Sequence, residues 1–449
     1  MKKDEPAPGT TQEPEVSRRD FLRSTGVSTV AVAAASFGPP RTAAAGPALS
    51  PRVIGANDRI GVGVIGVKGM GAGHIKHVQE QMPGENAQIV AVCDLWENAR
   101  AKAREAARLE ERQVHSDYRR LLEQKDVDAV IVATPDHWHE KIAIAALQSG
   151  RHVYLEKPMT RHLDEAFAIA DVAKRSSCLL QLGTQGCSEP KWQRARELVR
   201  SGQLGRLLWA QASYCRNNPH GEWNYEIDPE LTENTVDWKA WVGPARKRPF
   251  SSERYFRWRK YWDYGTGVIG DLLPHRVAPL LFALGLDEYP RTVACMGSNL
   301  ADTDRGPDPA TGRPYGDRRE VADTHVVSVE FPSGFLMILA SGTANERGID
   351  DVIRGHKANL VLGGGKLLLE PERPYTDELE RLEETVLEPP NNHANHLRNF
   401  FEALRGNEKL NAPVELALQV QTLVSMAEKA YRERTLVRFD AQSRKIKAV

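Results

Sequence analysis

The chain has 449 residues with 60 basic and 60 acidic side chains, a length that allows two domains with separate hydrophobic cores. The balanced charge gives no electrostatic case for a nucleic-acid partner or an anionic membrane surface, and no apolar run reaches the length of a membrane span. The five cysteines are scattered and none forms a Cys-x-x-Cys pair, so we expect neither a disulfide framework nor a metal site.

The first 45 residues are typical of an export signal rather than of a folded domain. The sequence SRRDFLR at residues 17–23 closely resembles a twin-arginine motif, an Ala/Val-rich stretch follows at 27–37, and Ala43-Ala44-Ala45 fits a small-residue cleavage site. We therefore expect residues 1–45 to be a twin-arginine signal peptide that engages the twin-arginine export machinery. The mature protein is then expected in the periplasm or otherwise outside the cytoplasm.

Residues 59–94 have the layout of a dinucleotide-binding βαβ unit. A strand (60–65), a glycine-rich turn (66–74) and a helical segment lead to a second strand (89–93), which ends on Asp94. The start of such a helix offers free N–H groups and a positive dipole end to a pyrophosphate. A carboxylate at the end of the second strand can accept hydrogen bonds from ribose hydroxyls and repels a 2′-phosphate, so NAD is expected and NADP is less favoured.

The glycine-rich turn departs from the usual fingerprint. Gly66, Gly69 and Gly71 take turn positions, but Lys68 stands where the second fingerprint glycine would be. A literal G-x-G-x-x-G match over 61–66 lies on the strand, and we interpret it as coincidental. Lys68 either shifts the register of the turn or places a cation near the pyrophosphate. The expected cofactor contacts in this unit are Gly66, Lys68, Gly69, Met70, Gly71 and Asp94.

Strands and helices continue to alternate as far as residue 182. Strands are expected at 127–133, 152–155 and 179–182, with helices at 97–111, 142–149 and 163–176. This order predicts an α/β fold with a doubly wound parallel sheet, hence an NAD-binding Rossmann domain over residues 46–182. Ligands of such sheets lie beyond the carboxyl ends of the strands.

Beyond residue 183 the pattern changes to strands with alternating polarity. Strands are expected at 205–212, 292–296, 325–331, 335–341, 358–362 and 366–369, with helices at 192–201, 397–405 and 414–432. A turn at 331–334 joins two of these strands as a hairpin. The sequence thus predicts an α+β domain over residues 183–449 with a large, mostly antiparallel open sheet.

Three short motifs accompany the glycine-rich turn: TPDHWH at 134–139, EKP at 156–158 and GTGVIGDLLPH at 265–275. Together they resemble the Gfo/Idh/MocA oxidoreductases, named for glucose–fructose oxidoreductase and inositol dehydrogenase. The resemblance covers about the whole mature chain and is strongest over 59–290. It implies a nicotinamide cofactor, a small-molecule carbohydrate substrate, and a C-terminal domain used for substrate binding and for assembly into a homo-oligomer.

The resemblance implies catalytic roles for Lys157, Asp271 and His275. Pro158 disfavours helix at Lys157, so the lysine ammonium can point into the crevice near a substrate hydroxyl. A histidine suits proton removal from an alcohol, and Asp271, four residues earlier on the same face of a helix, can orient its ring. On spacing alone, a surface lysine and a core histidine behind an N-cap aspartate are the simpler interpretations.

Further cofactor contacts are implied by the resemblance rather than by spacing. They are Thr134, Pro135, His139, Glu156, Lys157 and Gln185. His137 and His139 are two residues apart and point to different faces of a helix start, so we do not expect them to share a metal ion.

Residues 254–264 form an aromatic and basic run that leads into the third motif. Aromatic faces beside guanidinium groups suit a sugar, whose C–H faces stack while its hydroxyls form hydrogen bonds. An aromatic core with a solvated charged side explains the same run equally well. Substrate contacts are expected from Arg257, Trp262 and Tyr264.

These observations predict an exported NAD-dependent oxidoreductase that acts on a hydroxyl of a sugar, cyclitol or glycoside. Free NAD is not available outside the cytoplasm, so the enzyme is expected to retain its cofactor tightly and to restore it within each cycle. One alternative is redox-neutral glycoside cleavage by transient oxidation and elimination. The glycosidase branch of the family lacks the lysine of EKP, whereas this chain keeps Lys157. Another alternative is a non-catalytic sugar-binding protein.

Overall fold

The computed structural model describes residues 49–55, 57–81, 83–218, 221–299, 319–363, 365–386 and 392–449. The expected signal peptide at 1–45 lies outside these residues. Residues Pro47–Val449 form one compact unit. Across the described ranges, no helix combines the length and the apolar character that a membrane span needs.

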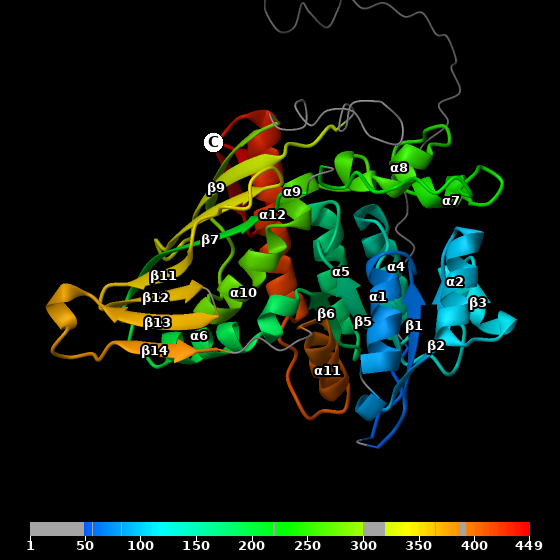
Figure 1. The fold of residues 1–449 in the computed structure, drawn as a ribbon, viewed down its shortest axis with the longest axis horizontal. Coiled ribbons are helices and arrows are strands. Elements are labelled where there is room, and N and C mark those ends of the chain that lie inside the picture. Colours follow the sequence, from blue (N-terminus) through cyan, green and yellow to red (C-terminus); the bar gives the residue numbers. More distant parts are fainter. Residues whose placement is uncertain are drawn as a thin grey trace, which may run out of the picture. The chain divides into compact units, whose positions relative to one another are not determined.

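Six parallel strands form the first sheet, in the order β3-β2-β1-β4-β5-β6 (Figure 1). They are β1 (Ile60–Ile65), β2 (Ala87–Cys93), β3 (Val114–His115), β4 (Ala129–Val132), β5 (His152–Glu156) and β6 (Leu180–Gly183). Every residue of β1, β4 and β5 is buried, because helices cover both faces of such a sheet. The strand order reverses between β1 and β4, which marks the ligand-binding edge. The prediction of a doubly wound parallel sheet is confirmed.

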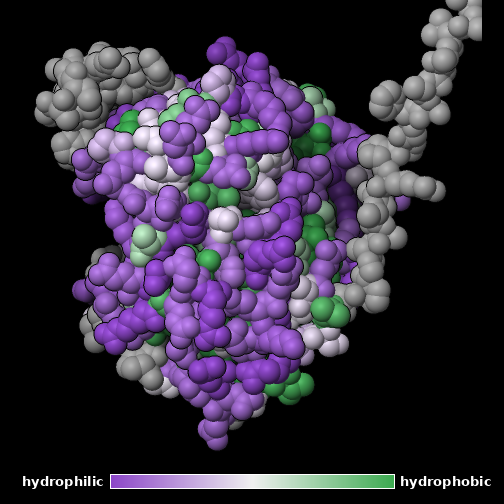
Figure 2. Space-filling model, turned by 90° about the vertical axis from the view of Figure 1, so that its right-hand side faces the viewer, coloured by the Kyte–Doolittle hydropathy of each residue, from purple (hydrophilic) through white to green (hydrophobic). Residues whose placement is uncertain are grey.

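Five helices connect these strands: α1 (Met70–Lys76), α2 (Glu97–Ala107), α3 (Tyr118–Leu122), α4 (His139–Gln148) and α5 (Leu163–Arg175). The helix expected over 97–111 ends at Ala107, because Arg108 adopts a left-handed conformation with φ of 51°. The side of the molecule that carries α2 and β3 is mostly hydrophilic, with isolated apolar residues (Figure 2).

The second sheet has ten strands in the order β14-β13-β12-β11-β7-β10-β9-β8-β15-β16 (Figure 1). They are β7 (Leu207–Cys215), β8 (Thr292–Ser298), β9 (Thr324–Glu330), β10 (Leu336–Gly342), β11 (Asp351–Gly355), β12 (Ala358–Gly363), β13 (Lys366–Pro371), β14 (Leu382–Thr385), β15 (Val437–Asp440) and β16 (Lys445–Ala448). Only the pair β7–β10 is parallel, so the prediction of a large, mostly antiparallel sheet is confirmed. Strands β11, β14, β15 and β16 were not expected.

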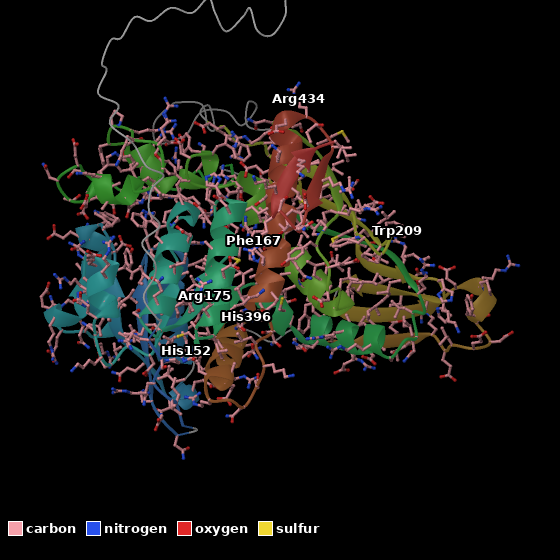
Figure 3. All side chains as sticks on the ribbon, turned by 180° about the vertical axis from the view of Figure 1, so that it is seen from behind. His152, Phe167, Arg175, Trp209, His396 and Arg434 are labelled. Atoms are coloured by element: carbon pink, nitrogen blue, oxygen red, sulfur yellow. The ribbon has the colours of Figure 1, made fainter. Side chains whose placement is uncertain are left out.

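Helices α10 (Pro274–Leu284) and α12 (Val414–Glu433) pack on one face of the ten-stranded sheet. Phe167 of α5 stacks on Phe439 of β15 with ring centroids 6.1 Å apart, which joins the two halves of the chain (Figure 3). Apolar side chains from both halves of the chain form one continuous cluster that runs from β4 and β5 to β9 and β10. The boundary expected between residues 182 and 183 falls inside β6, and it stays a prediction.

The irregular stretch after β7 contains α7 (Trp238–Val242), α8 (Ser252–Phe256) and the 3-10 turn η6 (Trp258–Lys260). These short elements lie beyond the carboxyl ends of the parallel strands (Figure 1). An isolated bridge between Trp96 and Val236 ties the stretch to the loop after β2. We call residues 223–259 the cover segment, because it forms the second wall of the site described next.

Candidate active site

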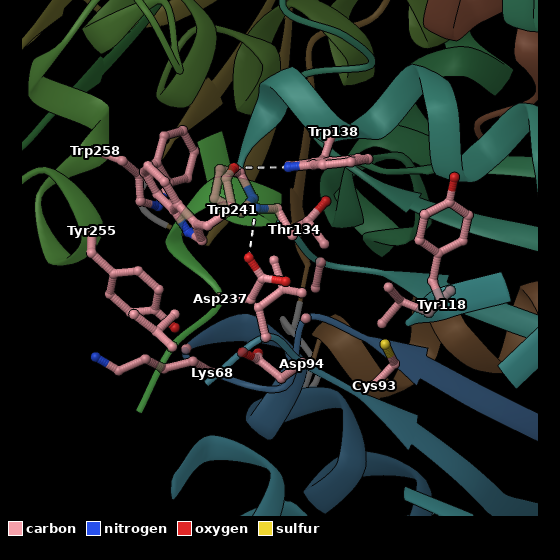
Figure 4. Close-up of a pocket in the computed structure, with 18 of the residues that line it drawn as sticks. Lys68, Cys93, Asp94, Tyr118, Thr134, Trp138, Asp237, Trp241, Tyr255 and Trp258 are labelled. Atoms are coloured by element: carbon pink, nitrogen blue, oxygen red, sulfur yellow. Dashed lines mark hydrogen bonds between the residues drawn. The ribbon is translucent and has the colours of Figure 1, made fainter. Parts of the chain in front are cut away.

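A cavity of about 1080 Å³ lies between the carboxyl edge of the parallel sheet and the cover segment (Figure 4). Its volume is at the upper end of the range for small-molecule sites. The sheet side contributes Gly66, Lys68, Gly69, Met70, Asp94, Thr134, Pro135, Asp136, Glu156 and Lys157 to the lining. The cover segment contributes Tyr225, Val236, Asp237, Trp241, Tyr255, Phe256, Trp258 and Arg259.

The glycines of the turn are required for different reasons. Gly66 has φ of 82°, and a Cβ there would lie 2.7 Å from the carbonyl oxygen of Ala133. A Cβ on Gly71 would lie 1.8 Å from the carbonyl oxygen of Gly66, so these two glycines allow the close approach of α1 to β1. Gly69 has φ of 55° and meets no atom within 4 Å, so its backbone borders open space. A pyrophosphate at the start of α1 fits this arrangement.

Lys68 keeps the glycine register intact and turns its side chain toward the cover segment. Its Nζ lies 3.4 Å from the ring centroid of Phe256 and 5.6 Å from that of Trp96. Burial lowers the pKa of Lys68 to about 8. Of the two alternatives drawn from the sequence, the register shift is excluded by the places of Gly66, Gly69 and Gly71.

Asp94 joins the glycine turn to the loop after β2 (Figure 4). Its Oδ2 accepts a hydrogen bond from the Val67 amide at 3.0 Å, and its Oδ1 accepts one from the Trp96 amide at 3.0 Å. Burial raises the pKa of Asp94, although these amides oppose the shift. Arg100, which also lines the cavity, donates from Nη1 to the Asp94 carbonyl oxygen at 2.9 Å.

Glu156, at the end of β5, forms a buried pair with His74 of α1, whose Nε2 lies 2.7 Å from Oε1. Burial alone would raise the pKa of Glu156, but the His74 hydrogen bond and the charge of Lys157 bring it down to about 2. The pair fixes α1 against β5, and therefore positions the glycine turn relative to the EKP motif.

His139 and Gln185 lie behind the cavity wall. The ring of His139 is 1% exposed, and its Nδ1 and Nε2 lie 2.8 and 2.9 Å from the carbonyl oxygens of Pro158 and Thr134. Gln185 is buried and donates to the Tyr154 hydroxyl at 3.3 Å. Neither lines the cavity, which corrects the expectation of direct cofactor contact. Both side chains instead hold the strand-end loops in place.

Lys157 lies at the centre of a charged network. Its Nζ donates to Asp271 Oδ1 at 2.6 Å and to the Asp271 carbonyl oxygen at 2.8 Å. Arg259 Nε donates to the same Oδ1 at 3.0 Å, and Trp223 Nε1 donates to Oδ2 at 2.9 Å. Burial opposes ionisation of Asp271, but Lys157 and Arg259 hold its pKa well below the usual value. Asp271 is therefore a carboxylate that orients the lysine ammonium.

Asp271 and His275 do not share one helix face, which corrects a prediction. Asp271 ends α9 (Gly267–Asp271), and a new helix, α10, begins at Pro274. Pro274 is the first residue of α10, a position that suits proline because the N–H it lacks would have no partner inside the helix. The Asp271 carboxylate has Lys157 and other donors as partners and makes no hydrogen bond to the His275 ring.

The ring of His275 stacks on Tyr214 with centroids 5.0 Å apart and planes 22° apart. Burial, with the charge of Lys157, lowers the pKa of His275 to about 3. The imidazole is therefore neutral at physiological pH, and these surroundings make it a weaker base than a free histidine. It does not line the cavity itself, so its contact with a reacting group requires the substrate to reach past Lys157.

Two of the three expected substrate residues already donate to other protein groups. Arg257 donates to the Tyr225 carbonyl oxygen and to Glu253, both at 2.9 Å, and Trp262 Nε1 donates to the Glu320 carbonyl oxygen at 2.9 Å.

The third, Tyr264, is fully buried against Trp241 and His137. None of these three residues lines the cavity, so the aromatic-core interpretation is right for Tyr264. The residues of this run that do line the cavity are Tyr255, Phe256, Trp258 and Arg259.

Asp136 was missed in the sequence, although it lies inside the TPDHWH motif. Its side chain is 3% exposed, lines the cavity and makes no hydrogen bond to a described residue. The next two residues anchor the cover segment, because His137 Nε2 and Trp138 Nε1 each lie 2.9 Å from the Trp241 carbonyl oxygen. Figure 4 shows the contact of Trp138. A carboxyl at this position could have been noticed as the one acidic side chain of the motif.

Replacing Asp136 with asparagine is expected to remove a pH dependence of stability. Burial raises the pKa of Asp136 from 3.8 to about 8, although Arg259 and Lys157 oppose the shift. A raised pKa stabilises the fold below the unfolded value, and this contribution is lost as the pH rises to about 8. The free energy of unfolding of Asp136→Asn should therefore rise relative to that of wild type between pH 5 and 8, by at most about 1.4 kcal/mol per pH unit. Urea unfolding of both proteins at the two pH values measures this; a difference that does not change with pH would contradict it.

Within the residues that the structure describes, no group of three or more His, Cys, Asp or Glu side chains could hold a metal ion.

Two family models match the chain. The model for the oxidoreductase family with an NAD-binding Rossmann fold, Gfo/Idh/MocA, matches residues 60–184. The model for the C-terminal α/β domain of the same oxidoreductase family matches residues 191–304. The two matches together cover more than half of the chain.

Known proteins resemble different parts of it. A glycosyl hydrolase family 109 protein from Shewanella pealeana is 28% identical over 242 residues, which are 51% of this chain and 51% of that protein. The chain thus spans about half the length of such curated relatives. A solved structure of levoglucosan dehydrogenase with NADH and L-sorbose has a TM-score of 0.65 at 18% identity, covering 85% of this chain and 99% of that one. An aldose–aldose oxidoreductase from Caulobacter crescentus, complexed with glycerol, has a TM-score of 0.61 at 18% identity, with coverages of 85% and 100%.

At these identities the solved structures establish the fold alone, whereas the family models match both halves in sequence. The glycine turn, the strand-end aspartate and the EKP loop meet around one cavity between these halves. The chain therefore belongs to the Gfo/Idh/MocA family of oxidoreductases, with an N-terminal NAD-binding Rossmann fold and a C-terminal α/β domain.

Proposed function

We propose that the protein is an NAD-retaining oxidoreductase that acts on a hydroxyl group of a sugar, cyclitol or glycoside. One observation carries the proposal: Lys157 lines a cavity of dinucleotide size, and its Nζ is held 2.6 Å from the Asp271 carboxylate. A buried, oriented ammonium beside a nicotinamide site is suited to a substrate oxygen that gains negative charge. The sugars in the names of the structural neighbours support the substrate class.

The roles of the residues follow from their contacts. NAD, when bound, supplies the hydride acceptor. An ammonium has three N–H donors; Asp271 takes two of those on Lys157, which leaves one for the substrate oxygen. The neutral ring of His275 can accept the hydroxyl proton. Asp271 acts by orienting Lys157 rather than the histidine ring.

NAD is proposed over NADP because of Asp94. Its carboxylate lines the cavity at the end of β2, where it would repel a 2′-phosphate. Arg100 and Arg119 also line this end, but Arg100 already donates to the Asp94 carbonyl oxygen. Gly66, Gly69, Met70, Thr134 and Pro135 are proposed to contact the cofactor through their backbone.

A second candidate function is redox-neutral glycoside cleavage. It is favoured by the similarity to the glycosyl hydrolase family 109 protein. Transient oxidation would acidify the neighbouring C–H group and allow elimination of the leaving group, which takes up a proton. Water would then add to the resulting unsaturated ketone, and return of the hydride would restore NAD and the sugar hydroxyl. The same cavity, Lys157 and His275 would serve both reactions.

The test uses protein from residue 46, purified without added nucleotide. Released cofactor is identified after denaturation, and nicotinamide absorbance is followed while sugars are presented to the native protein. Retained NAD that a sugar reduces lastingly, and that a second carbonyl compound reoxidises, is the expected result. Aglycone release from a model glycoside without net reduction supports the second candidate. Absence of any bound or bindable dinucleotide overturns both.

We also propose that residues 1–45 direct twin-arginine export to the periplasm, on the basis of the SRRDFLR motif. A reporter fused after residue 46 should be exported, and the double change Arg18→Lys and Arg19→Lys should retain it in the cytoplasm.

A homo-oligomer is proposed as well, because Met296, Val326, Leu336 and Ile338 are 38–76% exposed on the uncovered face of the ten-stranded sheet. Light scattering would give the mass; a monomeric value would contradict this.

A further inference from the structure

We infer that the substrate carries an anionic group, the carboxylate of a uronic acid or a sulfate ester, and that Arg259 binds it. The inference rests on the proposed function, since it names the substrate class of the same site. It also gives a role to a residue of the aromatic and basic run other than the three expected to bind substrate.

Arg259 is fixed next to the proposed reaction centre. It belongs to η6 and lines the cavity. Its Nε donates at 3.0 Å to Asp271 Oδ1, the same oxygen that accepts from Lys157 Nζ at 2.6 Å. One carboxylate oxygen therefore joins the guanidinium to the lysine ammonium. The Trp258 ring supports the guanidinium from one side, with 4.2 Å between the guanidinium carbon and the ring centroid.

The two terminal nitrogens of the Arg259 guanidinium are available to bind a ligand. Neither terminal nitrogen of Arg259 donates to any residue that the structure describes, and the side chain is 24% exposed. A guanidinium carries five N–H donors, of which the Nε–H of Arg259 is used. The four others form the planar fork that binds carboxylate or sulfate oxygens through two parallel hydrogen bonds.

The charge balance of the network favours an anion. Lys157 and Arg259 bring two positive charges, and the one carboxylate that both of them contact is Asp271. The carboxylate of Glu156, next to Lys157 in sequence, faces His74 at 2.7 Å. Asp136 does not restore the balance at neutral pH, because burial raises its pKa to about 8. The charge of nearby Arg216 is matched by Glu222, at 3.2 Å. Arg259 thus shares a single carboxylate oxygen with Lys157 and has no anionic partner for its terminal nitrogens among the described residues. A partly buried guanidinium is costly without such a partner, and an anionic substituent on the sugar would supply one.

A neutral sugar would leave this fork satisfied only by hydroxyl groups. A bond from a guanidinium to a hydroxyl has one ionised partner, whereas a guanidinium–carboxylate or guanidinium–sulfate pair has two and forms two parallel hydrogen bonds. Loss of a charged hydrogen-bond partner costs roughly 10- to 100-fold in binding per bond. The arrangement is therefore expected to discriminate strongly between a uronic acid and the hexose of the same stereochemistry.

The experiment compares matched substrates on matched variants. Methyl glycosides of glucuronate and galacturonate, of the corresponding neutral hexoses, and of their 6-sulfates are presented to wild type, Arg259→Gln and Arg259→Lys. Arg200→Gln, an exposed arginine on α6 (Pro190–Arg200), is the surface control. Bound NAD per chain is measured for each variant as a readout independent of turnover.

Wild type should prefer one anionic series over its neutral counterpart by about 100-fold in kcat/KM, and the preferred series identifies carboxylate or sulfate as the source. Arg259→Gln should lose most of this preference, mainly through KM, and keep its NAD. Arg259→Lys should recover part of it, because it keeps the charge without the fork. Equal turnover of neutral and anionic sugars by wild type overturns the inference. Loss of NAD from Arg259→Gln also overturns it, since Arg259 would then hold the cofactor.

Failure of the proposed function can be distinguished from failure of the inference. If no sugar is turned over, the quenching of tryptophan fluorescence is titrated with the same anionic and neutral glycosides. Saturable binding of an anionic glycoside that Arg259→Gln weakens and Arg200→Gln does not supports the inference without the reaction. Absence of such binding overturns it.

Discussion

Replacing Lys157 with methionine is expected to lower kcat by a factor of about 100 to 10,000, the usual range for a lost proton-transfer or electrostatic group. Methionine keeps an unbranched side chain in the same space but removes the ammonium that Asp271 orients at 2.6 Å. The substrate oxygen then loses its stabilising charge. Steady-state kinetics with the substrate found for wild type give the change, and bound NAD per chain should stay the same.

The fold should survive this change, because Asp271 keeps Arg259 at 3.0 Å and Trp223 at 2.9 Å as hydrogen-bond donors. Lys174→Met, at an exposed position of α5, is the control and should leave kcat unaltered. Wild-type turnover in the Lys157 variant would remove the basis of the proposed mechanism and revive a non-catalytic, sugar-binding role.

Gly71→Ala is expected to abolish retention of the dinucleotide and to destabilise the chain. The new Cβ would lie 1.8 Å from the Gly66 carbonyl oxygen, so α1 would have to move away from β1 and take the glycine turn with it. Overpacking of this kind costs about 1–3 kcal/mol or more. The ratio of NAD to protein after gel filtration and the midpoint of thermal unfolding measure the two effects.

Gly73→Ala is the matched control in the same helix. A Cβ at Gly73 would meet no atom within 4 Å, and alanine favours a helix over glycine by about 1 kcal/mol. This variant should keep its NAD and unfold at a slightly higher temperature. If both variants lost NAD equally, the contact between Gly71 and Gly66 would not be what positions the turn.

The glycine turn, the strand-end aspartate and the alternation of strands and helices could be predicted because they depend on local patterns. Buried parallel strands appear as short apolar runs, and the run at 60–65 becomes the fully buried β1. Gly66 and Gly71 stand where a backbone must come within van der Waals distance of another. Asp94 follows its strand directly, so its place at the carboxyl edge is a consequence of chain order.

The partners of the site residues were decided by the tertiary structure. Lys157 and Asp271 are 114 residues apart in sequence, and nothing in either motif states that they meet. The spacing of Asp271 and His275 favoured one helix face, but Pro274 starts a separate helix. In the sequence, Lys68 was a departure from the glycine fingerprint without an evident role. In the structure, its ammonium packs on Phe256 of the cover segment.

The aromatic and basic run shows most clearly that the sequence alone does not identify which side chains form the site. Its composition indicated a sugar site, but composition does not determine which side chains face a cavity. Trp258 and Arg259 lie in a 3-10 turn beside the cavity, while Tyr264, a few residues on, is fully buried in the core. Sequence by itself determined the two sheets and the dinucleotide fingerprint, because periodicity and turn chemistry are local, and its short motifs carried the resemblance to the family. Only the tertiary structure decided the charge network, because ion pairs form between segments brought together by packing.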